Sequence, residues 1–274
     1  MEERIGFLIG AAAVYLYAVM PNLRRRAGRM KGALYAHRGL HNRAAGVPEN
    51  TMTAFRKAVE AGFGIELDIQ LTRDEQVVVF HDMNLKRVCG AAGYVSDYTY
   101  EELQQFRIFD TEERIPLFAD VLKLVDGRVP LLVELKYKNF SNRVCERADE
   151  LLSQYDGEYV IESFHPWALM WYRRHRPEIL RGQLSMNFQR QEGNYSPEQF
   201  LMRHLLMNFF GRPDFIAYDL RDCRAVSKNI CRKVFGCPSA AWTVRSQEQL
   251  ERIRPYYDAF IFEGFCPRSG LTAD

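Results

Sequence analysis

Two histidines and two closely spaced carboxylates lie in the first third of the chain. They are His37, Glu66, Asp68 and His81, and a third carboxylate, Glu134, follows later in the sequence. Imidazoles exchange protons near neutral pH, and carboxylate oxygens are the ligands that hard divalent cations prefer. Histidines combined with such an acidic set indicate the chemistry of phosphoester cleavage.

The three carboxylates are predicted to share one metal ion. Glu66 and Asp68 are two residues apart in a predicted strand, so their side chains point to the same face. Neighbouring carboxylates repel each other unless one is protonated or a cation lies between them. Glu134 ends another predicted strand, and three such oxygen donors suit Mg²⁺ or Ca²⁺. A salt-bridged acidic pair in the interior is the alternative.

The two histidines are predicted to form an acid–base pair. His37 ends the first predicted strand, and His81 ends the second arm of a predicted hairpin. One imidazole could accept a proton while the other donates one. The remaining histidines lack this setting and are expected to be structural or surface residues: His41, His165, His175 and His204.

Arg38 and Lys136 are cations beside the predicted catalytic positions. Either could hold phosphate oxygens, and an arginine can do so through two parallel hydrogen bonds. Each could instead pair with a neighbouring carboxylate, but Lys136 shares a strand face with Glu134, which favours a place in the site. Phe164 and Trp242 could line a pocket or belong to the core.

Short β-branched or aromatic runs alternate with helical patterns from residue 33 to residue 263. This alternation is typical of parallel sheets built from strand–helix–strand units. The predicted strands are 33–36, 65–71, 77–81, 131–135, 159–163, 181–185, 215–219, 240–244 and 260–262.

Nine strands are one more than a (β/α)8 barrel contains. Only five residues join strand 65–71 to strand 77–81, and a connection that short makes a hairpin, since a parallel crossover needs a dozen or more. We therefore predict an α/β fold, a (β/α)8 TIM barrel over residues 33–274. Residues 82–116 are expected to form a small insertion after the hairpin, with one helix from Thr99 to Phe106 and Thr99 as its N-cap.

Residues 1–32 are predicted to form an N-terminal transmembrane anchor with a basic flank. Residues 5–20 hold no charge and, with residues 21–23, reach the lower length for crossing a bilayer. The positive-inside tendency then predicts a single-pass protein of the cell membrane with a cytoplasmic catalytic domain. A cleaved signal peptide and a peripheral or buried helix are the alternatives. The basic residues of the flank are Arg24, Arg25, Arg26, Arg29 and Lys31.

The net charge of +2 is unevenly distributed along the chain. Residues 1–32 carry six cations and two anions, so the remaining residues sum to −2. A slightly acidic body lacks the basic face of a nucleic-acid-binding protein, and we expect no such partner. The apolar stretch of residues 200–210 is predicted to be one helix packed on the barrel; a surface lying on a bilayer or a partner is the alternative.

Several short segments of the chain, taken together, resemble the motifs of the glycerophosphodiester phosphodiesterase family. The resemblance covers about residues 33–265, and the segments come in the family's order. They include AHRG at 36–39, PENT at 48–51, IELDIQLTRD at 65–74, VVVFHD at 77–82, VELK at 133–136, ESF at 162–164 and AWTV at 241–244.

The resemblance implies hydrolysis of a glycerophosphodiester to sn-glycerol 3-phosphate and an alcohol, through a cyclic phosphate formed by the glycerol 2-hydroxyl. It implies His37 and His81 as the acid–base pair. It also implies one divalent cation, Mg²⁺ or Ca²⁺, held by Glu66, Asp68 and Glu134. It places Arg38 and Lys136 on the phosphate. The predicted substrate contacts are these two together with Glu49, Phe164 and Trp242.

Two other activities remain open. One is a lysophospholipase D or sphingomyelinase D-like activity on membrane lysolipids, and the other is a catalytically idle protein that binds phosphodiesters. The chain departs from the family pattern at Arg245, where asparagine is frequent, and at Glu263, where the last strand often ends in Thr-Asp. An added cation and a longer acid at these positions could change which head group is accepted.

Overall fold

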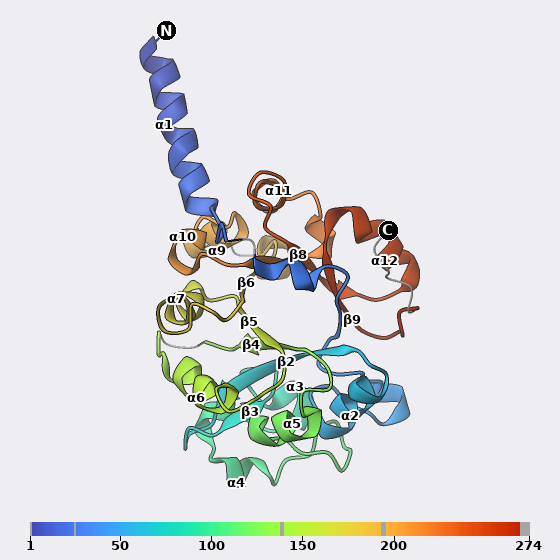
Figure 1. Cartoon of the computed structure of the whole chain (residues 1–274). Helices are drawn as coiled ribbons and strands as arrows, with labels where there is room; N and C mark the ends of the chain where they lie inside the picture. Colours follow the sequence, from blue (N-terminus) through green and yellow to red (C-terminus); the bar gives the residue numbers. More distant parts are fainter. Residues whose placement is uncertain (1, 25, 138–139, 193–195, 269–274) are drawn as a thin grey trace.

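The computed structural model describes residues 2–24, 26–137, 140–192 and 196–268. Within these residues, nine strands form one sheet in the order β1-β9-β8-β7-β6-β5-β4-β2-β3. Parallel pairing of β1 with β2 closes eight of them into a barrel (Figure 1). The strands are β1 (Leu34–Ala36), β2 (Gly64–Leu71), β3 (Val77–Val79), β4 (Leu131–Leu135), β5 (Tyr159–Ser163), β6 (Arg181–Ser185), β7 (Phe215–Asp219), β8 (Ser239–Val244) and β9 (Ala259–Phe262).

The predicted (β/α)8 barrel is confirmed, and so is the prediction that the ninth strand belongs to a hairpin. β3 pairs antiparallel with β2 only, so it is the outer arm of a hairpin and does not enter the barrel wall. All nine predicted strands appear within two residues of their expected bounds.

Helices surround the barrel and connect its strands (Figure 1). The α-helices are α1 (Glu2–Val19), α2 (Met52–Glu60), α3 (Lys86–Cys89), α4 (Tyr100–Leu103), α5 (Phe118–Val125), α6 (Arg143–Leu152), α7 (Pro166–His175), α8 (Gln189–Glu192), α9 (Pro197–Arg203), α10 (Asn208–Gly211), α11 (Val226–Lys233) and α12 (Gln247–Ile253). Short 3-10 helices are η1 (Arg26–Met30), η2 (Arg43–Ala45), η3 (Val95–Asp97), η4 (Leu220–Asp222) and η5 (Arg254–Tyr256).

Strand alternation divides the core into two layers. In β4, Leu132 packs in the cluster that fills the barrel, whereas Leu131, Val133 and Leu135 pack between the strands and the helices. Because successive side chains point to opposite faces, Glu134 faces the barrel interior, like Leu132. Its place near the carboxyl end of β4 brings it to the face of the barrel where catalytic residues gather.

The segment between β3 and α5 carries a small core of its own. Val88, Val95, Leu103 and Ile108 are buried there against Phe80. Thr99 caps α4 as predicted, since its hydroxyl accepts a hydrogen bond from the Glu102 amide and Glu102 reaches back to the Thr99 amide. The helix is shorter than the predicted one and ends at Leu103.

The prediction of a transmembrane anchor is wrong. No helix among residues 2–24, 26–137, 140–192 and 196–268 is long and apolar enough to cross a membrane. The physical reason is length: α1 begins with charged residues, and its uncharged part, Ile5 to Val19, extends only about 22 Å at 1.5 Å per residue, short of a hydrocarbon core of about 30 Å. The cytoplasmic location, the boundary at residue 32 and the end of the catalytic domain at residue 274 stay predictions. Arg25 of the basic flank and residues 269–274 lie outside the described part.

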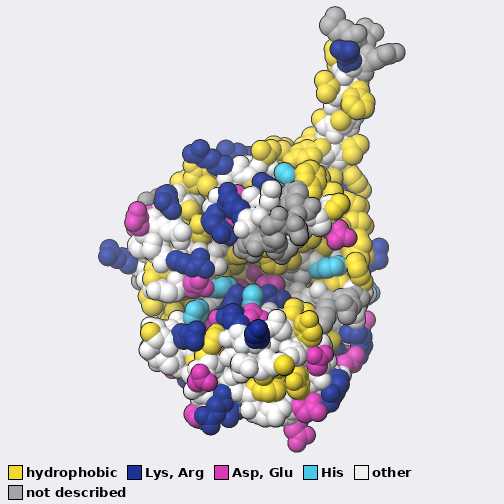
Figure 2. All heavy atoms as spheres, turned by 180° about the vertical axis from the view of Figure 1, so that it is seen from behind, with side chains coloured by type: hydrophobic (Ala, Val, Ile, Leu, Met, Phe, Trp, Pro, Cys, Tyr) yellow, Lys and Arg dark blue, Asp and Glu magenta, His cyan; other side chains and the backbone are white. Residues whose placement is uncertain are grey.

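Helix α1 projects away from the barrel, and only its C-terminal end is packed (Figures 1 and 2). Val19 is fully buried, and the Arg212 side chain donates hydrogen bonds to the carbonyl oxygens of Tyr17 (2.9 Å) and Met20 (2.7 Å). The Tyr17 ring also stacks on Phe209 of α10 at 6.4 Å between centroids.

Residues 200–210 do not form the single predicted helix. They divide into the end of α9 and the start of α10, and Leu205 between them has a φ of 55°, which is outside the helical region. The Leu205 side chain at this turn is buried in the main core, and its burial is consistent with a break in the helix here.

Candidate active site

The predicted site residues meet at the carboxyl ends of the barrel strands. A cavity of about 370 Å³ opens there. Figure 2 shows histidine, basic and acidic side chains gathered in a recess on that face. One side of the cavity is polar and the other apolar; its lining includes His37, Arg38, Glu66, His81, Glu134, Glu162, Phe164, Leu184, Met186, Trp242, Arg245 and Ile261. A larger hollow of about 580 Å³ over the insertion contains none of the predicted site residues.

The three predicted metal ligands lie together at the base of this recess. Glu66, Asp68 and Glu134 are buried, and each offers an oxygen within 4.8 Å of the others. Lys136, directly after β4, places its Nζ 2.8 Å from Asp68 Oδ1 and 2.7 Å from Glu134 Oε1. The backbone amide of Arg38 donates to Glu66 Oε2 at 2.9 Å.

The cluster carries more negative charge than its neighbours neutralise. Burial and the charges of Asp68 and Glu134 raise the pKa of Glu66 well above its usual value. Burial also raises the pKa of Glu134 in spite of Lys136. For Asp68, burial would act in the same direction, but Lys136, His81 and Arg38 hold its pKa well below the usual range. A cation among the three oxygens would relieve this repulsion.

His37, directly after β1, is held by the carboxylate of Glu263, directly after β9. Its Nδ1 lies 2.5 Å from Glu263 Oε2, and the other oxygen of Glu263 accepts a 2.7 Å hydrogen bond from Arg245. An ionised carboxylate only accepts, so Nδ1 carries the proton and the Nε2 lone pair is free. Nε2 lies 4.0 Å from Glu66 Oε2 and therefore faces the acidic cluster. Burial lowers the pKa of His37 to about 4, opposed by Glu263, so its imidazole is neutral at pH 7.

His81, which also lines the cavity, has a similar arrangement. Its Nδ1 lies 2.7 Å from Asp82 Oδ1, and Arg87 donates to both oxygens of Asp82 at 2.7 and 2.8 Å. Arg87 also bonds Glu49, which in turn accepts a 2.6 Å hydrogen bond from Arg38. Each predicted catalytic histidine is thus oriented by a carboxylate that an arginine supports.

The loop after β1 brings Arg38 next to the acidic cluster, and several of its residues have positive φ angles. Arg38 and Asn50 have φ values of 54° and 53°, and Asn50 donates to Asp68 Oδ2 at 2.9 Å. Between them, Gly39 has a φ of 81°, and a Cβ at this position would lie 2.9 Å from the backbone carbon of Ala54. Only glycine satisfies both the backbone conformation and this close approach.

The predicted substrate contacts divide into two groups. Arg38, Phe164 and Trp242 line the cavity. Glu49 and Lys136 do not line it, because Glu49 lies behind Arg38 and Lys136 is engaged by the acidic cluster.

Sequence reasoning missed a fourth buried acid, Glu162. It pairs in register with Glu134 on the next strand, so strand alignment could have found it. Its Oε2 is buried without a hydrogen-bond partner among the described residues, and burial, with the charges of Glu66 and Glu134, raises its pKa well above the usual value. The orienting roles of Asp82 and Glu263 were also missed.

A comparison with protein families connects this geometry to known enzymes. Residues 37–257 match the profile of the glycerophosphoryl diester phosphodiesterase family. The chain belongs to this family. The matched range contains the acidic cluster and both histidines, and the resemblance seen in the sequence is confirmed. The prediction that the chain is an enzyme, a phosphodiester hydrolase of this family, is confirmed with it.

Individual members support the assignment. A glycerophosphodiester phosphodiesterase of Caldanaerobacter subterraneus is 34% identical over 236 residues, which cover 82% of this chain and 90% of that protein. A rat lysophospholipase D is 34% identical over 169 residues, 57% of this chain and 51% of that protein, so the match spans about half of its length. The structure of an Oleispira antarctica phosphodiesterase, solved with the product sn-glycerol-3-phosphate, superposes with a TM-score of 0.69 at 23% identity. That match covers 86% of this chain and 94% of that one, and it shows the shared fold.

Proposed function

We propose that this protein hydrolyses glycerophosphodiesters to sn-glycerol 3-phosphate and an alcohol. The proposal rests chiefly on two histidines, each with Nδ1 held by a carboxylate, beside three buried carboxylates whose oxygens lie within 4.8 Å of one another. The names of the family and of the Caldanaerobacter relative support this substrate class.

The residues at the base of the recess fit a divalent cation, Mg²⁺ or Ca²⁺. Glu66, Asp68 and Glu134 supply only oxygen donors, which both ions prefer. When bound, the ion would neutralise negative charge on phosphate oxygens. The raised pKa values of Glu66 and Glu134 are consistent with this assignment. Burial is their main cause and the charge of Asp68 adds to it, and a bound cation would favour the ionised carboxylates.

His37 is suited to be the base and His81 the acid. A neutral His37 with a free Nε2 can take the proton from the glycerol 2-hydroxyl, whose oxygen then bonds to phosphorus. The bond from phosphorus to the alcohol oxygen breaks, and His81 gives that oxygen a proton. Water then opens the cyclic phosphate with the two histidines in exchanged roles. Arg38 at the cavity wall is placed to bind phosphate oxygens, and Lys136 holds Asp68 and Glu134 in position.

A lysophospholipase D activity is the second candidate. The observation that favours it is the apolar side of the cavity, formed by Phe164, Leu184, Met186, Trp242 and Ile261. Such a wall could accept the aliphatic part of a lysolipid. The name of the rat relative is consistent with it.

A panel of substrates with matched variants tests the proposal. Wild-type protein is expected to release glycerol 3-phosphate from glycerophosphocholine in the presence of Mg²⁺ or Ca²⁺ and to lose activity in EDTA. His37→Ala and Glu134→Gln are expected to be inactive. His175→Ala serves as the control, because His175 at the end of α7 packs on Trp171 and does not line the cavity. Turnover that persists unchanged in EDTA would contradict the proposed role of the three acids.

Two further substrates separate the alternatives. Faster release of choline from lysophosphatidylcholine than from glycerophosphocholine would favour the lysophospholipase D activity. A 2-deoxy analogue of the substrate should resist cleavage, and cleavage at the rate of the parent compound would exclude attack by the 2-hydroxyl.

A further inference from the structure

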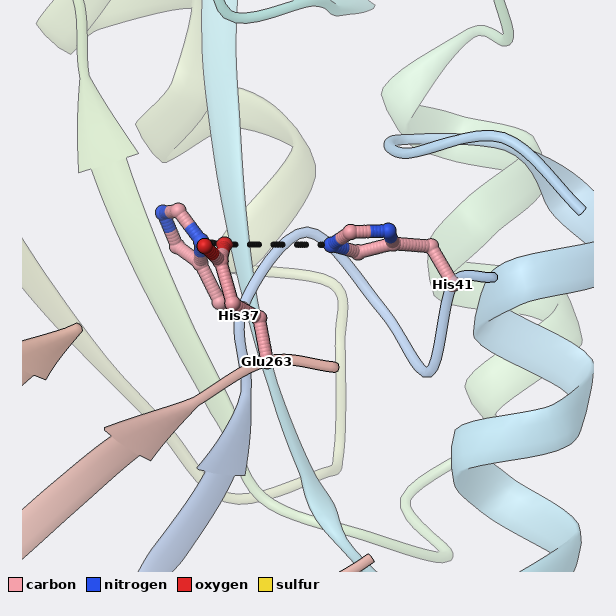
Figure 3. A group of neighbouring side chains, drawn as sticks. All are labelled: His37, His41 and Glu263. Carbon is pink, nitrogen blue, oxygen red and sulfur yellow. Dashed lines mark hydrogen bonds and ion pairs between the residues drawn. The ribbon is translucent and has the colours of Figure 1, made fainter. Parts of the chain in front are cut away.

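A second group of potential metal ligands lies beside the acidic cluster. It consists of His37, His41 and Glu263, whose donor atoms lie within 4.8 Å of one another (Figure 3). His37 and His41 come from the loop after β1, and Glu263 follows β9 at the other end of the barrel sequence. Figure 3 shows the Glu263 carboxylate between the two imidazoles.

His41 contributes an unsatisfied nitrogen to this group. Its Nε2 is buried without a hydrogen-bond partner in the described part of the chain. It lies 3.9 Å from Glu263 Oε2, an ion-pair contact (dashed in Figure 3) that is too long for a hydrogen bond. Native structures rarely leave a buried polar atom without a partner, and a bound ligand is one explanation. The atom therefore points to a ligand between His41 and Glu263.

The spacing and types of the donors suit a zinc ion. In a tetrahedral site with ligands about 2.0–2.2 Å from Zn²⁺, neighbouring donors are about 3.3–3.5 Å apart. The two distances to Glu263 Oε2, 2.5 Å from His37 and 3.9 Å from His41, lie on either side of that value. Side-chain shifts of about 0.5–1 Å would therefore place the three donors around one ion, with a water as the fourth ligand. Two imidazoles favour Zn²⁺ over Mg²⁺, whereas the all-oxygen cluster has the opposite preference.

We propose that His37, His41 and Glu263 form an inhibitory Zn²⁺ site. Arg245 would orient the Glu263 ligand, because Arg245 donates a hydrogen bond to Glu263 Oε1 and leaves Oε2 for the ion. The site is separate from the carboxylate cluster but shares His37 with the proposed catalytic pair.

Inhibition follows from the tautomer of His37, and this step rests on the proposed function. Without zinc, the Nδ1 proton is donated to Glu263 and Nε2 is free to accept a proton. A zinc ion on Nδ1 moves that proton to Nε2. His37 then has no free lone pair and cannot act as a base, although the carboxylate cluster is unchanged.

Metal binding is tested with Co²⁺, a spectroscopic substitute for zinc, in the presence of excess Mg²⁺. Wild-type protein is expected to bind one Co²⁺ with the strong visible absorption of a four-coordinate site. His41→Gln should weaken this binding at least about tenfold and raise the half-inhibitory Zn²⁺ concentration by the same factor. Glu134→Gln is the matched control, since it alters the carboxylate cluster and should keep the Co²⁺ absorption.

Three results would overturn the proposal. They are equal Co²⁺ affinity in wild type and His41→Gln, loss of the Co²⁺ absorption in Glu134→Gln, and Zn²⁺ binding at this group without inhibition. If His41→Gln does not fold, anomalous scattering from wild-type crystals grown with Zn²⁺ decides, because density away from His41 refutes the site. The spectrum does not depend on turnover, so failure of the zinc site and failure of the proposed hydrolysis are distinguishable.

Discussion

Glu263→Gln tests whether the carboxylate that holds His37 contributes to catalysis. Glutamine has the same length and can still accept a hydrogen bond from Nδ1, but it carries no charge. When His37 takes a proton, the imidazolium in the wild-type protein faces an ionised carboxylate at 2.5 Å, and in the variant it does not. The substitution therefore removes a charge-assisted hydrogen bond at the step in which the base becomes charged.

The expected decrease in kcat follows from the free energy that such a hydrogen bond contributes. Hydrogen bonds to charged groups contribute about 1.5–3 kcal/mol, and each 1.36 kcal/mol changes a rate tenfold. The kcat of Glu263→Gln should fall roughly tenfold to a hundredfold. KM should change little, because Glu263 contacts His37 and Arg245 and does not line the cavity.

Arg245→Gln is the matched comparison for kcat; its KM is not compared, because Arg245 lines the cavity. The Arg245 side chain is 66% exposed, and exposed ion pairs contribute about 0–1 kcal/mol, so this variant should lose no more than about fivefold in kcat. The assay measures kcat and KM for glycerophosphocholine at saturating Mg²⁺, with the Tm of each variant recorded to exclude unfolding. A Glu263→Gln kcat within about twofold of wild type, or a loss confined to KM, would refute the reasoning.

Three further predictions concern stability. Glu162→Gln should cost less than about 1 kcal/mol of unfolding free energy in urea, because burial already favours the neutral form of Glu162 and glutamine keeps its shape; a large loss would show that this acid is charged in the fold. Burial would raise the pKa of Glu49, but hydrogen bonds and charges from Arg87 and Arg38 lower it from 4.5 to about 2. The ionised carboxylate therefore contributes about 3 kcal/mol of stability above pH 4.5, which is lost as the pH falls through 2. Glu49→Gln should reduce the loss of stability between pH 7 and pH 3 in urea melts. Gly39→Ala should lower stability by about 1–3 kcal/mol and reduce kcat, since its Cβ meets Ala54 and its φ is 81°; an unchanged Tm would contradict this.

Much of the barrel could be predicted because its signals are local. Short buried strands are visible in the sequence as compact apolar runs. The five-residue connection after β2 excluded a parallel crossover, so eight of the nine strands were assigned to the barrel and β3 to the outer arm of a hairpin. The convergence of Glu66, Asp68 and Glu134 followed from strand alternation and from the common edge at which parallel strands end. These inferences needed no knowledge of distant contacts.

Two predictions made from local composition were wrong for the same reason. Residues 200–210 have the composition of one helix, but packing of Leu205 into the core breaks them into two. The N-terminal apolar run suggested a membrane span, yet its uncharged helical part is too short to cross. Composition predicts that a segment is apolar and does not predict where the chain turns or ends as a helix.

The sequence by itself determined the fold class, the family and the types of residue at the site, because short-range periodicity and ordered motifs carry that information. Only the tertiary structure decided how His37 is held. Its partner is Glu263, 226 residues away, whereas His81 is held by Asp82, its neighbour in the sequence. The hydrogen bond between His37 and Glu263 arises from barrel closure, which places the first and last strands side by side, and no local pattern records it.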